Sequence, residues 1–577
     1  MKRQVALTFF SLLLAGPAAA QESVVAGRHN LSRTGPGPVK AENVEEICFF
    51  CHVPHRGGRG GNNRPDTSAS YTPYASSTQR AARPEVLGES TRLCMSCHDG
   101  TIALGQTRRD SQFLPTQGTL ADGRLGDRPS NLGTDLRSSH PVSVSAPASF
   151  ELKDPGPGPV KQDARGKVQC TSCHDPHQSA NAVEGNFLVK TNRQGELCLS
   201  CHAKAFWWTQ PSSHQSSTAP YDRRLGATTP FITVADNACM ACHQTHQART
   251  PARLLKDNVS GVCMQCHTGR VASKDLSGDL AKSFAHPVGA TGSVHDAAEG
   301  PQNQAILLPE RRPSALRHAE CVDCHNPHAT NAMTAAAPRV SGALMGVWGI
   351  DRNGERVEPA QYEYEVCFKC HGDSANRPQR SGPRPPNRVR RATADVRQAF
   401  DLSAASSHPI EGPGRNFDVP GLLPPLTASS VIYCSDCHAS DTGKGAGGTG
   451  PSGPHGSAFP GLLERKLETA DITGESPAAY ALCYKCHDRE VLLSTRSNFP
   501  THREHVQRSM VPCTACHDWH GISALQGNPV NNAHLINFDL SIVKPVTSGR
   551  LSYTSNGVRS GTCSVSCHGR DHEETPY

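Results

Sequence analysis

The side chains of this sequence that can do covalent and metal chemistry are cysteines in close pairs, each pair followed at once by a histidine. Residues 170–174 read Cys-Thr-Ser-Cys-His, and residues 198–202 read Cys-Leu-Ser-Cys-His. Two thiols at this spacing can form thioethers with the two vinyl groups of a haem, while the adjacent imidazole coordinates the iron. The pattern therefore predicts covalently attached c-type haem.

This signature occurs twelve times and accounts for all 24 cysteines. The predicted attachment residues, numbered sites 1 to 12 in chain order, are Cys48/Cys51/His52, Cys94/Cys97/His98, Cys170/Cys173/His174, Cys198/Cys201/His202, Cys239/Cys242/His243, Cys263/Cys266/His267, Cys321/Cys324/His325, Cys367/Cys370/His371, Cys434/Cys437/His438, Cys483/Cys486/His487, Cys513/Cys516/His517 and Cys563/Cys567/His568. Site 12 has one extra residue between its cysteines, which still allows two thioethers. We expect about twelve haem c groups and a short helical turn over each site.

Disulfide bonds and zinc explain the cysteines less well than haem. A disulfide needs no histidine after each cysteine pair, and a zinc site would combine two pairs without a histidine at each one. The chain has only 5% aromatic residues but contains 51 glycines and 44 prolines, so long helices and broad sheets are not expected. Each site also has too few residues for an apolar core of its own. The expected fold is mostly coil with short α-helices and little β-structure.

Further histidines repeat around the sites and group them in twos. In sites 1, 3, 5, 7 and 11 a second histidine stands three residues after the haem histidine, and a lone histidine precedes the odd-numbered sites. The hexamer Gly-Pro-Gly-Pro-Val-Lys recurs at residues 35–40 and 156–161, between such a lone histidine and the next cysteine. We therefore expect a haem-organised, elongated array of six two-haem modules. Their predicted bounds are residues 21–136, 137–212, 213–284, 285–405, 406–498 and 499–577.

These motifs resemble the doubled C-x-x-C-H multihaem cytochromes c, over essentially the whole chain after the first 20 residues. The resemblance implies bis-histidine, low-potential haems whose sixth ligands are the upstream His-Pro histidine and the histidine of C-H-x-P-H. The count of residues favours the same ligation, because 17 histidines remain beyond the twelve haem histidines and only seven methionines compete with them. The predicted sixth ligands are His29, His55, His140, His177, His214, His246, His286, His328, His408, His455, His505 and His520.

His455 is predicted to fill a gap in the repeat. No histidine follows His438 at the usual distance, and a glycine-rich stretch at residues 443–453 leads instead to Gly-Pro-His455-Gly. A proline before and a glycine after would hold the imidazole at the tip of a turn. The alternative is that His455 is a surface residue, and that one haem is then five-coordinate or takes another histidine such as His534.

Two basic segments bear on location and partners. Residues 1–20 combine Lys2 and Arg3 with an apolar stretch and a small-residue end, so we expect a cleaved signal peptide and export, with no membrane-spanning segment in the mature chain. Arg384, Arg388 and Arg390 lie in an arginine- and proline-rich join, expected to be solvated or to pair with haem propionates, or else to dock an acidic redox partner. The formal charge of +6 does not indicate nucleic-acid binding, because haem propionates offset it.

The expected function is electron transfer through a chain of about twelve bis-histidine haems, in periplasmic or extracellular respiration. Partners would be other cytochromes or an outer-membrane porin, and the protein would be periplasmic, outer-membrane-associated or extracellular. No catalytic residue is predicted, because six-coordinate iron leaves no position for a substrate. Two alternatives stay open: a multihaem reductase with one open-site haem, for which site 12 is the place to look, and a self-assembling extracellular haem filament.

Overall fold

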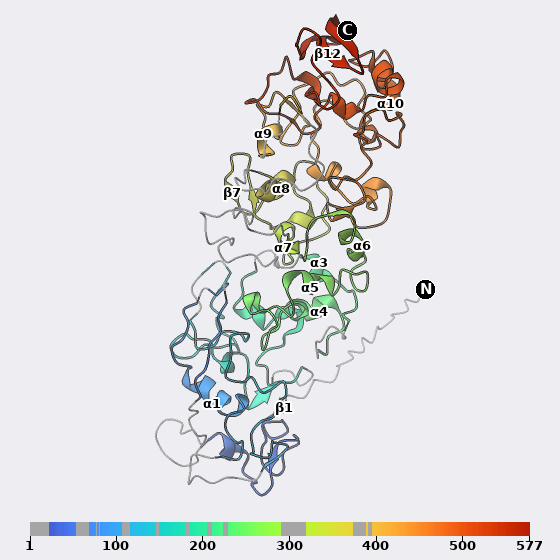
Figure 1. Ribbon diagram of the computed structural model, residues 1–577. Helices are drawn as coiled ribbons and strands as arrows, with labels where there is room; N and C mark the ends of the chain where they lie inside the picture. The colour runs from blue at the N-terminus through green and yellow to red at the C-terminus, as the bar shows by residue number, and fades with distance from the viewer. Residues whose placement is uncertain are drawn as a thin grey trace, which may run out of the picture. The chain divides into compact units, whose positions relative to one another are not determined.

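Short helices and two-residue strands joined by turns and coil make up most of the chain (Figure 1). The computed structural model describes residues 22–52, 69–76, 78–79, 81–106, 116–145, 149, 151–179, 184–204, 211–222, 229–289, 319–372, 388–390 and 395–577. The predicted signal peptide and His55 lie outside the described residues. The prediction of coil with short helices and little sheet is confirmed, whereas the six module boundaries stay a prediction.

The longest described helices contain attachment sites 2 and 8. The α-helices are α1 (Glu89–His98), α3 (Ser213–Ser216), α4 (Val234–Asn237), α5 (Val259–Met264), α6 (Ser277–Leu280), α7 (Cys321–Cys324), α8 (Glu363–His371), α9 (Arg397–Phe400) and α10 (Arg489–Leu492). Side chains cap α4 and α10: the hydroxyl of Thr233 accepts from the backbone N–H of Asp236 at α4 (3.0 Å), and Asp488 caps α10. Most other attachment sites lie on single 3₁₀ turns, for example Cys170–Ser172 and Cys434–Asp436.

The strands are mostly two residues long, and most of the two-stranded pairs join strands that are far apart in sequence. They are β1 (Glu22–Ser23), β2 (Lys40–Ala41), β3 (Thr116–Gln117), β4 (Gln178–Ser179), β5 (Phe284–Ala285), β6 (Gly349–Ile350), β7 (Arg356–Val357), β8 (Ser406–Ser407), β9 (Gly456–Ser457), β10 (Gly521–Ile522), β11 (Ser552–Gly557), β12 (Ser560–Cys567) and β13 (Arg570–Pro576). The antiparallel pairs are β1–β4, β2–β3, β5–β9, β6–β7 and β8–β10, and β11–β12–β13 form a three-stranded sheet.

Cys-x-x-Cys-His closes one helical turn at its attachment sites. In site 3 the backbone N–H of His174 donates to the carbonyl oxygen of Cys170 at 3.0 Å, and site 1 has the same bond from His52 to Cys48 at 2.9 Å. Positions one, four and five of such a turn share a face of the helix. Both thiols and the imidazole therefore point to the same side, as attachment of one haem requires.

Site 12 is an exception, and the expectation of a helical turn there is wrong. Cys563 and Cys567 lie in strand β12, which pairs with β11 and β13. The additional residue puts His568 five positions after the first cysteine, so the bond that closes the turn in the other sites is out of register. Burial of Val565 against Tyr553 favours the alternating pattern of a strand instead.

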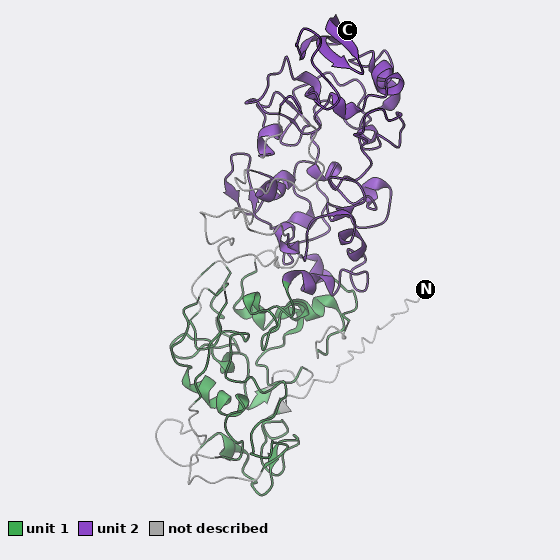
Figure 2. Cartoon of the chain, viewed as in Figure 1, with its two compact units in different colours: residues 1–205, 217–258 green, residues 206–216, 259–577 purple. Residues whose placement is uncertain are grey.

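The chain divides into two compact units (Figure 2). Unit 1 comprises residues 1–205 and 217–258, and unit 2 comprises residues 206–216 and 259–577. Buried apolar side chains of the described residues gather in small separate clusters, such as Leu87, Met95 and Leu136 in unit 1. Clusters of this size leave most attachment cysteines only partly covered by protein, which agrees with an interior completed by a large apolar group.

Candidate functional site

Histidine rings lie in pairs that join the histidine of one attachment site to a histidine from elsewhere. In unit 1 the ring centroids are 6.2 Å apart for His29 and His98, 6.1 Å for His52 and His177, 6.3 Å for His140 and His202, and 6.2 Å for His174 and His246. In unit 2 they are 6.2 Å for His214 and His267, 6.4 Å for His286 and His371, 6.1 Å for His325 and His455, 5.9 Å for His438 and His520, and 6.4 Å for His502 and His517.

The shared feature of these pairs is their distance and not a type of ring contact. The angle between the two ring planes runs from 17° for His52 and His177 to 90° for His140 and His202. A metal–imidazole bond is about 2 Å long and the ring centroid lies about 1 Å behind the nitrogen, so two imidazoles on opposite sides of one iron have centroids about 6 Å apart. The residues present therefore fit a bis-histidine haem.

Backbone carbonyls orient the haem histidines. The Nδ1 atoms of these rings lie 2.7 to 2.8 Å from a carbonyl oxygen: His98 with Ser130, His174 with Asn186, His243 with Arg253, His325 with Ala343, His438 with Gly461, and His517 with His534. A ring that donates from Nδ1 to a carbonyl keeps a lone pair on Nε2, the nitrogen that faces a metal. Each of these imidazoles is thus held in the tautomer that can coordinate iron.

The residues that supply these carbonyls were missed at the sequence level. Residues 186–188, 253–255, 461–463 and 534–536 read Asn-Phe-Leu, Arg-Leu-Leu, Gly-Leu-Leu and His-Leu-Ile, and the last residue of each forms a β-bridge to the haem histidine. Positive φ angles at Arg253 (59°) and His534 (57°) turn the carbonyl inward. The sequence did contain a signal for these segments, because a pair of large apolar residues recurs after sites 3, 5, 9 and 11. His534, considered above as a spare ligand, contributes its carbonyl to His517.

Pairs of two-residue antiparallel strands, called ladders below, hold several candidate sixth ligands. Strand β5 ends next to His286 and β9 begins just after His455, and the N–H of His286 donates to the carbonyl of His455 at 3.3 Å. Strands β8 and β10 repeat this arrangement for His408 and His520, at 3.4 Å. In unit 1, β1 pairs with β4 directly after His177. Each ladder brings an upstream histidine beside a histidine that follows a later site.

The two histidines of a ladder reach different attachment sites, and the assignment follows a constant shift. A histidine that follows an odd site pairs with the haem histidine two sites earlier: His177 with site 1, His246 with site 3, His455 with site 7 and His520 with site 9. An upstream histidine pairs with the next even site: His29 with site 2, His140 with site 4, His214 with site 6 and His286 with site 8. The predicted two-haem modules are therefore interlocked by their histidines.

Burial keeps several of these rings uncharged. Burial, followed by the charge of the paired ring, lowers the pKa of His455 to about 4, and burial likewise lowers the pKa of His29 and of His246 to about 4. A neutral imidazole offers the lone pair that iron needs. For His487 of site 10, burial and then the charge of His408 lower the pKa to about 4, which places His408 close to that site.

The remaining predicted sixth ligands have other positions. The N–H of His328 donates to the side chain of Asn326 at 3.0 Å, and the carbonyl of the adjacent Pro327 lies 3.1 Å from Nδ1 of His214. His505 lies beside His572, with ring centroids 5.9 Å apart, and neither ring belongs to a Cys-His step. His502, which was not among the predicted ligands, is the histidine that pairs with site 11.

Thiol contacts link neighbouring sites in order along each unit. Hydrogen bonds join the first cysteines of sites 2 and 3, 4 and 5, 6 and 7, 8 and 9, and 10 and 11. In four of these pairs the bond raises the pKa of one thiol, that of Cys94, Cys198, Cys367 or Cys513. The second cysteine of a site faces the site on its other side. In site 3, burial and then the nearby Cys201 of site 4 raise the pKa of Cys173 to about 11. Cys437 faces Cys486, and Cys516 faces Cys567, in the same way. Sites adjacent in sequence are therefore adjacent in space within each unit.

The second cysteines of sites 1, 2, 5, 6 and 8 lie on or just after the helical turns of their own sites. Their thiols range from exposed in site 1 to half-buried in the other four, and the residues are Cys51, Cys97, Cys242, Cys266 and Cys370. Cys97 lies in α1 and Cys370 in α8. The backbone N–H groups of Cys51, Cys242 and Cys266 each donate to the carbonyl of the first cysteine of their site at 3.2 Å.

These contacts place the five cysteines on their helical turns, but they do not confirm the predicted thioethers. Cys51 lies close enough to Cys94 of site 2 for its charge to raise the pKa of that thiol, after the larger effects of the Cys170 hydrogen bond and of burial. Attachment of haem through Cys51, Cys97, Cys242, Cys266 and Cys370 therefore stays a prediction from the motif.

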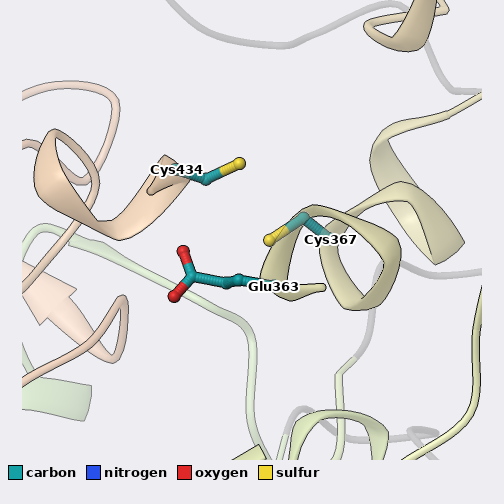
Figure 3. Close-up of side chains that lie close together, drawn as sticks. All are labelled: Glu363, Cys367 and Cys434. Carbon is teal, nitrogen blue, oxygen red and sulfur yellow. The ribbon is translucent and has the colours of Figure 1, made fainter. Parts of the chain in front are cut away.

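A carboxylate lies against one of the thiol contacts between sites (Figure 3). Ligand atoms of Glu363, Cys367 and Cys434 lie within 4.8 Å of one another, which is close enough to hold a metal ion. Glu363 already accepts from the backbone N–H and the hydroxyl of Ser435, both at 2.9 Å, and both cysteines belong to haem attachment sites. The cluster therefore lies where the predicted attachment sites 8 and 9 meet.

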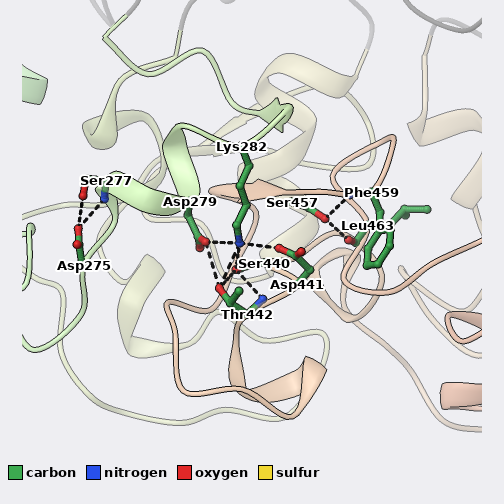
Figure 4. A network of polar contacts seen from close by, with 10 residues as sticks. All are labelled: Asp275, Ser277, Asp279, Lys282, Ser440, Asp441, Thr442, Ser457, Phe459 and Leu463. Carbon is green, nitrogen blue, oxygen red and sulfur yellow. Dashed lines mark hydrogen bonds and ion pairs between the residues drawn. The ribbon is translucent and has the colours of Figure 1, made fainter. Parts of the chain in front are cut away.

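A partly buried lysine fastens the ladder that carries His286 and His455 (Figure 4). The Nζ atom of Lys282 lies 2.5 Å from the carboxylate of Asp279 and 2.6 Å from that of Asp441. Asp279 is 3% exposed and also accepts from the hydroxyl of Thr442. Burial alone would lower the pKa of Lys282, but its bonds to both carboxylates raise it, so the ammonium stays charged. This network joins α6, just before β5, to the loop that leads to β9.

Comparison with known families supports haem chemistry. The doubled CXXCH motif matches residues 158–206, 233–272 and 424–492, which contain sites 3 and 4, 5 and 6, and 9 and 10. No curated protein matches the chain. Among the described residues, the helices are too short or too polar to cross a membrane. The matched motif indicates a multihaem c-type cytochrome with covalently bound haem c and a role in electron transfer.

Proposed function

We propose that this chain is an exported relay that passes electrons through about twelve covalently bound, bis-histidine haems. The observation that carries the proposal is the series of histidine pairs at 5.9 to 6.4 Å, each containing the histidine of an attachment site. Cysteines would hold the porphyrins by thioethers, and the paired imidazoles would hold the irons from both faces. Bound haem c supplies a one-electron couple of low potential when both ligands are histidine.

The order of the sites favours a relay over independent redox centres. Contacts between Cys94 and Cys170, and between Cys367 and Cys434, join successive sites through their first cysteines. Porphyrins attached to adjoining cysteines would lie edge to edge or face to face, so an electron could pass from site to site without leaving the protein. The chain's own residues would keep the irons six-coordinate and exclude substrates.

The intact mass of the purified protein tests the number of haems and the removal of residues 1–20 together. We expect the mass of the polypeptide from residue 21 onward plus that of about twelve haems. A mass equal to the bare polypeptide would refute the proposal, and a fractional loss would identify which sites remain empty after peptide mapping.

Carbon monoxide separates a relay from a reductase. Bis-histidine iron is low-spin and binds carbon monoxide poorly, whereas a five-coordinate reductase haem binds it readily. We expect a low-spin spectrum and little binding in the freshly reduced protein. Binding that amounts to one haem equivalent or more would favour the reductase.

Partners and compartment follow from this function. An exported relay would exchange electrons with other cytochromes or with a porin-associated complex in the outer membrane, from the periplasm or the cell exterior. A filament would need histidines from one copy to ligate haems of another. Sedimentation of the purified holoprotein distinguishes these forms, since a relay that works as a single chain stays small at all concentrations.

A further inference from the structure

The histidine expected to ligate the haem of site 12 is turned to a different partner. His568 and Gly569 form the two-residue turn of the β12–β13 hairpin, with φ angles of 50° and 77°. The Nε2 atom of His568 lies 3.0 Å from the carboxylate of Asp471, and the residue is exposed. Nε2 is the nitrogen that the other haem histidines keep available for iron, so the side chain is engaged at the atom that ligation requires.

His572 occupies the place that His568 leaves. It lies directly opposite Val565 in the β12–β13 ladder. Val565, Cys563 and Cys567 alternate along β12 and all pack on the same apolar cluster, so they share one face of the sheet. Directly opposed residues of an antiparallel pair have side chains on the same face. The imidazole of His572 is therefore on the cysteine face beside Val565, and a bulge in the ladder separates this pair from the pair of Cys563 with Thr575.

Burial and neighbouring rings agree with this position. His572 is the one residue of β13 that is partly buried, while the others are exposed. Its ring centroid lies 5.9 Å from that of His505, within the range of the other pairs. The Nδ1 atom of His505 lies 3.0 Å from the carbonyl of Thr501, so a donating Nδ1 keeps the lone pair on Nε2.

The constant shift also leads to His505. Upstream histidines pair with the next even site, from His29 and site 2 to His286 and site 8. His502 and His505 both precede site 11, and because His502 pairs with site 11 itself, His505 is the upstream histidine that the shift assigns to site 12. Its ring faces His572 and not His568.

We propose that the haem of site 12 is attached through Cys563 and Cys567 but ligated by His572 and His505, with the adjacent His568 outside the coordination sphere. The extra residue between the cysteines allows a strand in place of the helical turn, and the neighbouring strand then supplies the imidazole. This inference rests on the proposed haem function. It predicts that site 12 is six-coordinate and so is not the open site of a reductase.

Three variants of the full-length holoprotein test the assignment: His572→Gly, His505→Gly and the double variant. Haem number is measured by intact mass, and spin state by electron paramagnetic resonance with and without added imidazole. We expect each single variant to keep its haem number and to convert one haem equivalent to high spin, which imidazole reverses. Because both residues would bind one iron, the double variant should also show one high-spin haem and not two.

His568→Gln is the matched control and should retain a fully low-spin spectrum. The proposal is overturned if His572→Gly keeps all of its haem in the low-spin state, or if His568→Gln creates a high-spin haem that imidazole restores. Two high-spin equivalents in the double variant would show that His505 and His572 serve different irons, which also contradicts it. A wild-type mass without any haem would refute the proposed function itself, and is read from the same samples.

Discussion

The backbone N–H of His408 donates to the carbonyl oxygen of His520 at 3.4 Å, although the two side chains point to different attachment sites. The ring of His520 lies 5.9 Å from that of His438 in site 9, while the charge of His408 acts on His487 in site 10. One short ladder thus fixes an imidazole beside each of two neighbouring attachment sites. A change in that ladder would disturb two sites at once, which independent modules would not allow.

His455 should ligate the haem of site 7, although it fills the gap in the repeat after site 9. Its ring lies 6.1 Å from His325. We expect His455→Gly to produce one high-spin haem equivalent that added imidazole restores, and the same change in a Cys321→Ser/Cys324→Ser background to produce none. Electron paramagnetic resonance measures both.

The control for this prediction is His534→Ala. Only the backbone carbonyl of His534 is needed by His517, so loss of the imidazole should leave every haem low-spin. A high-spin haem in the double-cysteine background of His455→Gly would reassign His455 to another site.

Lys282 should stabilise the ladder that carries His286 and His455. Its ammonium is the counterion of Asp279, which is 3% exposed, so Lys282→Met leaves a buried carboxylate uncompensated. Breaking a buried ion pair on one side costs about 3–5 kcal/mol. We expect a clearly lower Tm of the holoprotein in a thermal melt, together with partial high-spin character.

Lys274→Met is the matched control for Lys282. Lys274 is exposed, and its ammonium bonds only to the carbonyl of Thr449 among the described contacts. Its removal should change the Tm little, because exposed charges contribute at most about 1 kcal/mol. Equal effects of the two variants would argue that the Lys282 network is not a structural fastening.

Arg388 should act as a buried support of site 11, which corrects the expectation of a solvated or docking arginine at this position. Its guanidinium is 3% exposed, bonds to the carbonyls of Thr514 (3.1 Å), His517 (2.9 Å) and Asn537, and lies 3.5 Å from Asp518. Arg388→Gln removes the partner of these groups. We expect a loss of stability of about 3–5 kcal/mol, measured by chemical denaturation of the holoprotein.

Arg390→Gln serves as the comparison, since Arg390 is exposed and contributes its backbone to Asn537. A change in stability near zero is expected for it. If Arg388→Gln also left the stability unchanged, other groups would have to donate hydrogen bonds to the carbonyls around site 11.

The attachment residues can be predicted from the sequence because their chemistry is local: two thiols and an imidazole within five positions form the haem-attachment motif without any tertiary contact. The pairing of His177 with site 1, or of His455 with site 7, cannot. These pairs depend on two-residue strands such as β5 and β9, which carry no period long enough to recognise. The carbonyl that Gly461 supplies to His438 was equally hidden, because backbone groups leave no mark in composition.

At site 12 the local motif predicts a ligand that the surrounding structure does not support. Cys567 followed by His568 matches the haem-attachment motif, yet His568 lies in the turn of the hairpin. His572, on the neighbouring strand, lies opposite Val565 instead. Which of the two faces the thiols is decided by Val565, buried on the cysteine face of β12. Cross-strand neighbours of this kind follow from register, which an isolated motif does not contain.

Glu411 should make the stability of unit 2 depend on pH. Its side chain is buried (7% exposed), and neither carboxylate oxygen has a hydrogen-bond partner among the described residues. Burial first, and then the charge of Asp401, raise the pKa of Glu411 to about 7, against the opposing effect of Arg352 and Arg397. Asp351 also faces it and raises the pKa. The folded protein therefore favours the protonated acid.

The sign of the effect follows from proton binding. Between the ordinary glutamate pKa of about 4.3 and pH 7, the folded state holds a proton at Glu411 that the unfolded state has released, so the free energy of unfolding falls as the pH rises through this window. The loss is on the order of 3 kcal/mol and is complete above about pH 7. Glu411→Gln, which keeps the shape without the charge, should abolish this dependence and be the more stable protein at pH 8. Denaturation of both proteins at pH 5 and pH 8 measures it, with exposed Glu490→Gln as control. A wild-type protein whose Glu411-dependent stability rises with pH would show that the carboxylate is ionised and paired in the folded state.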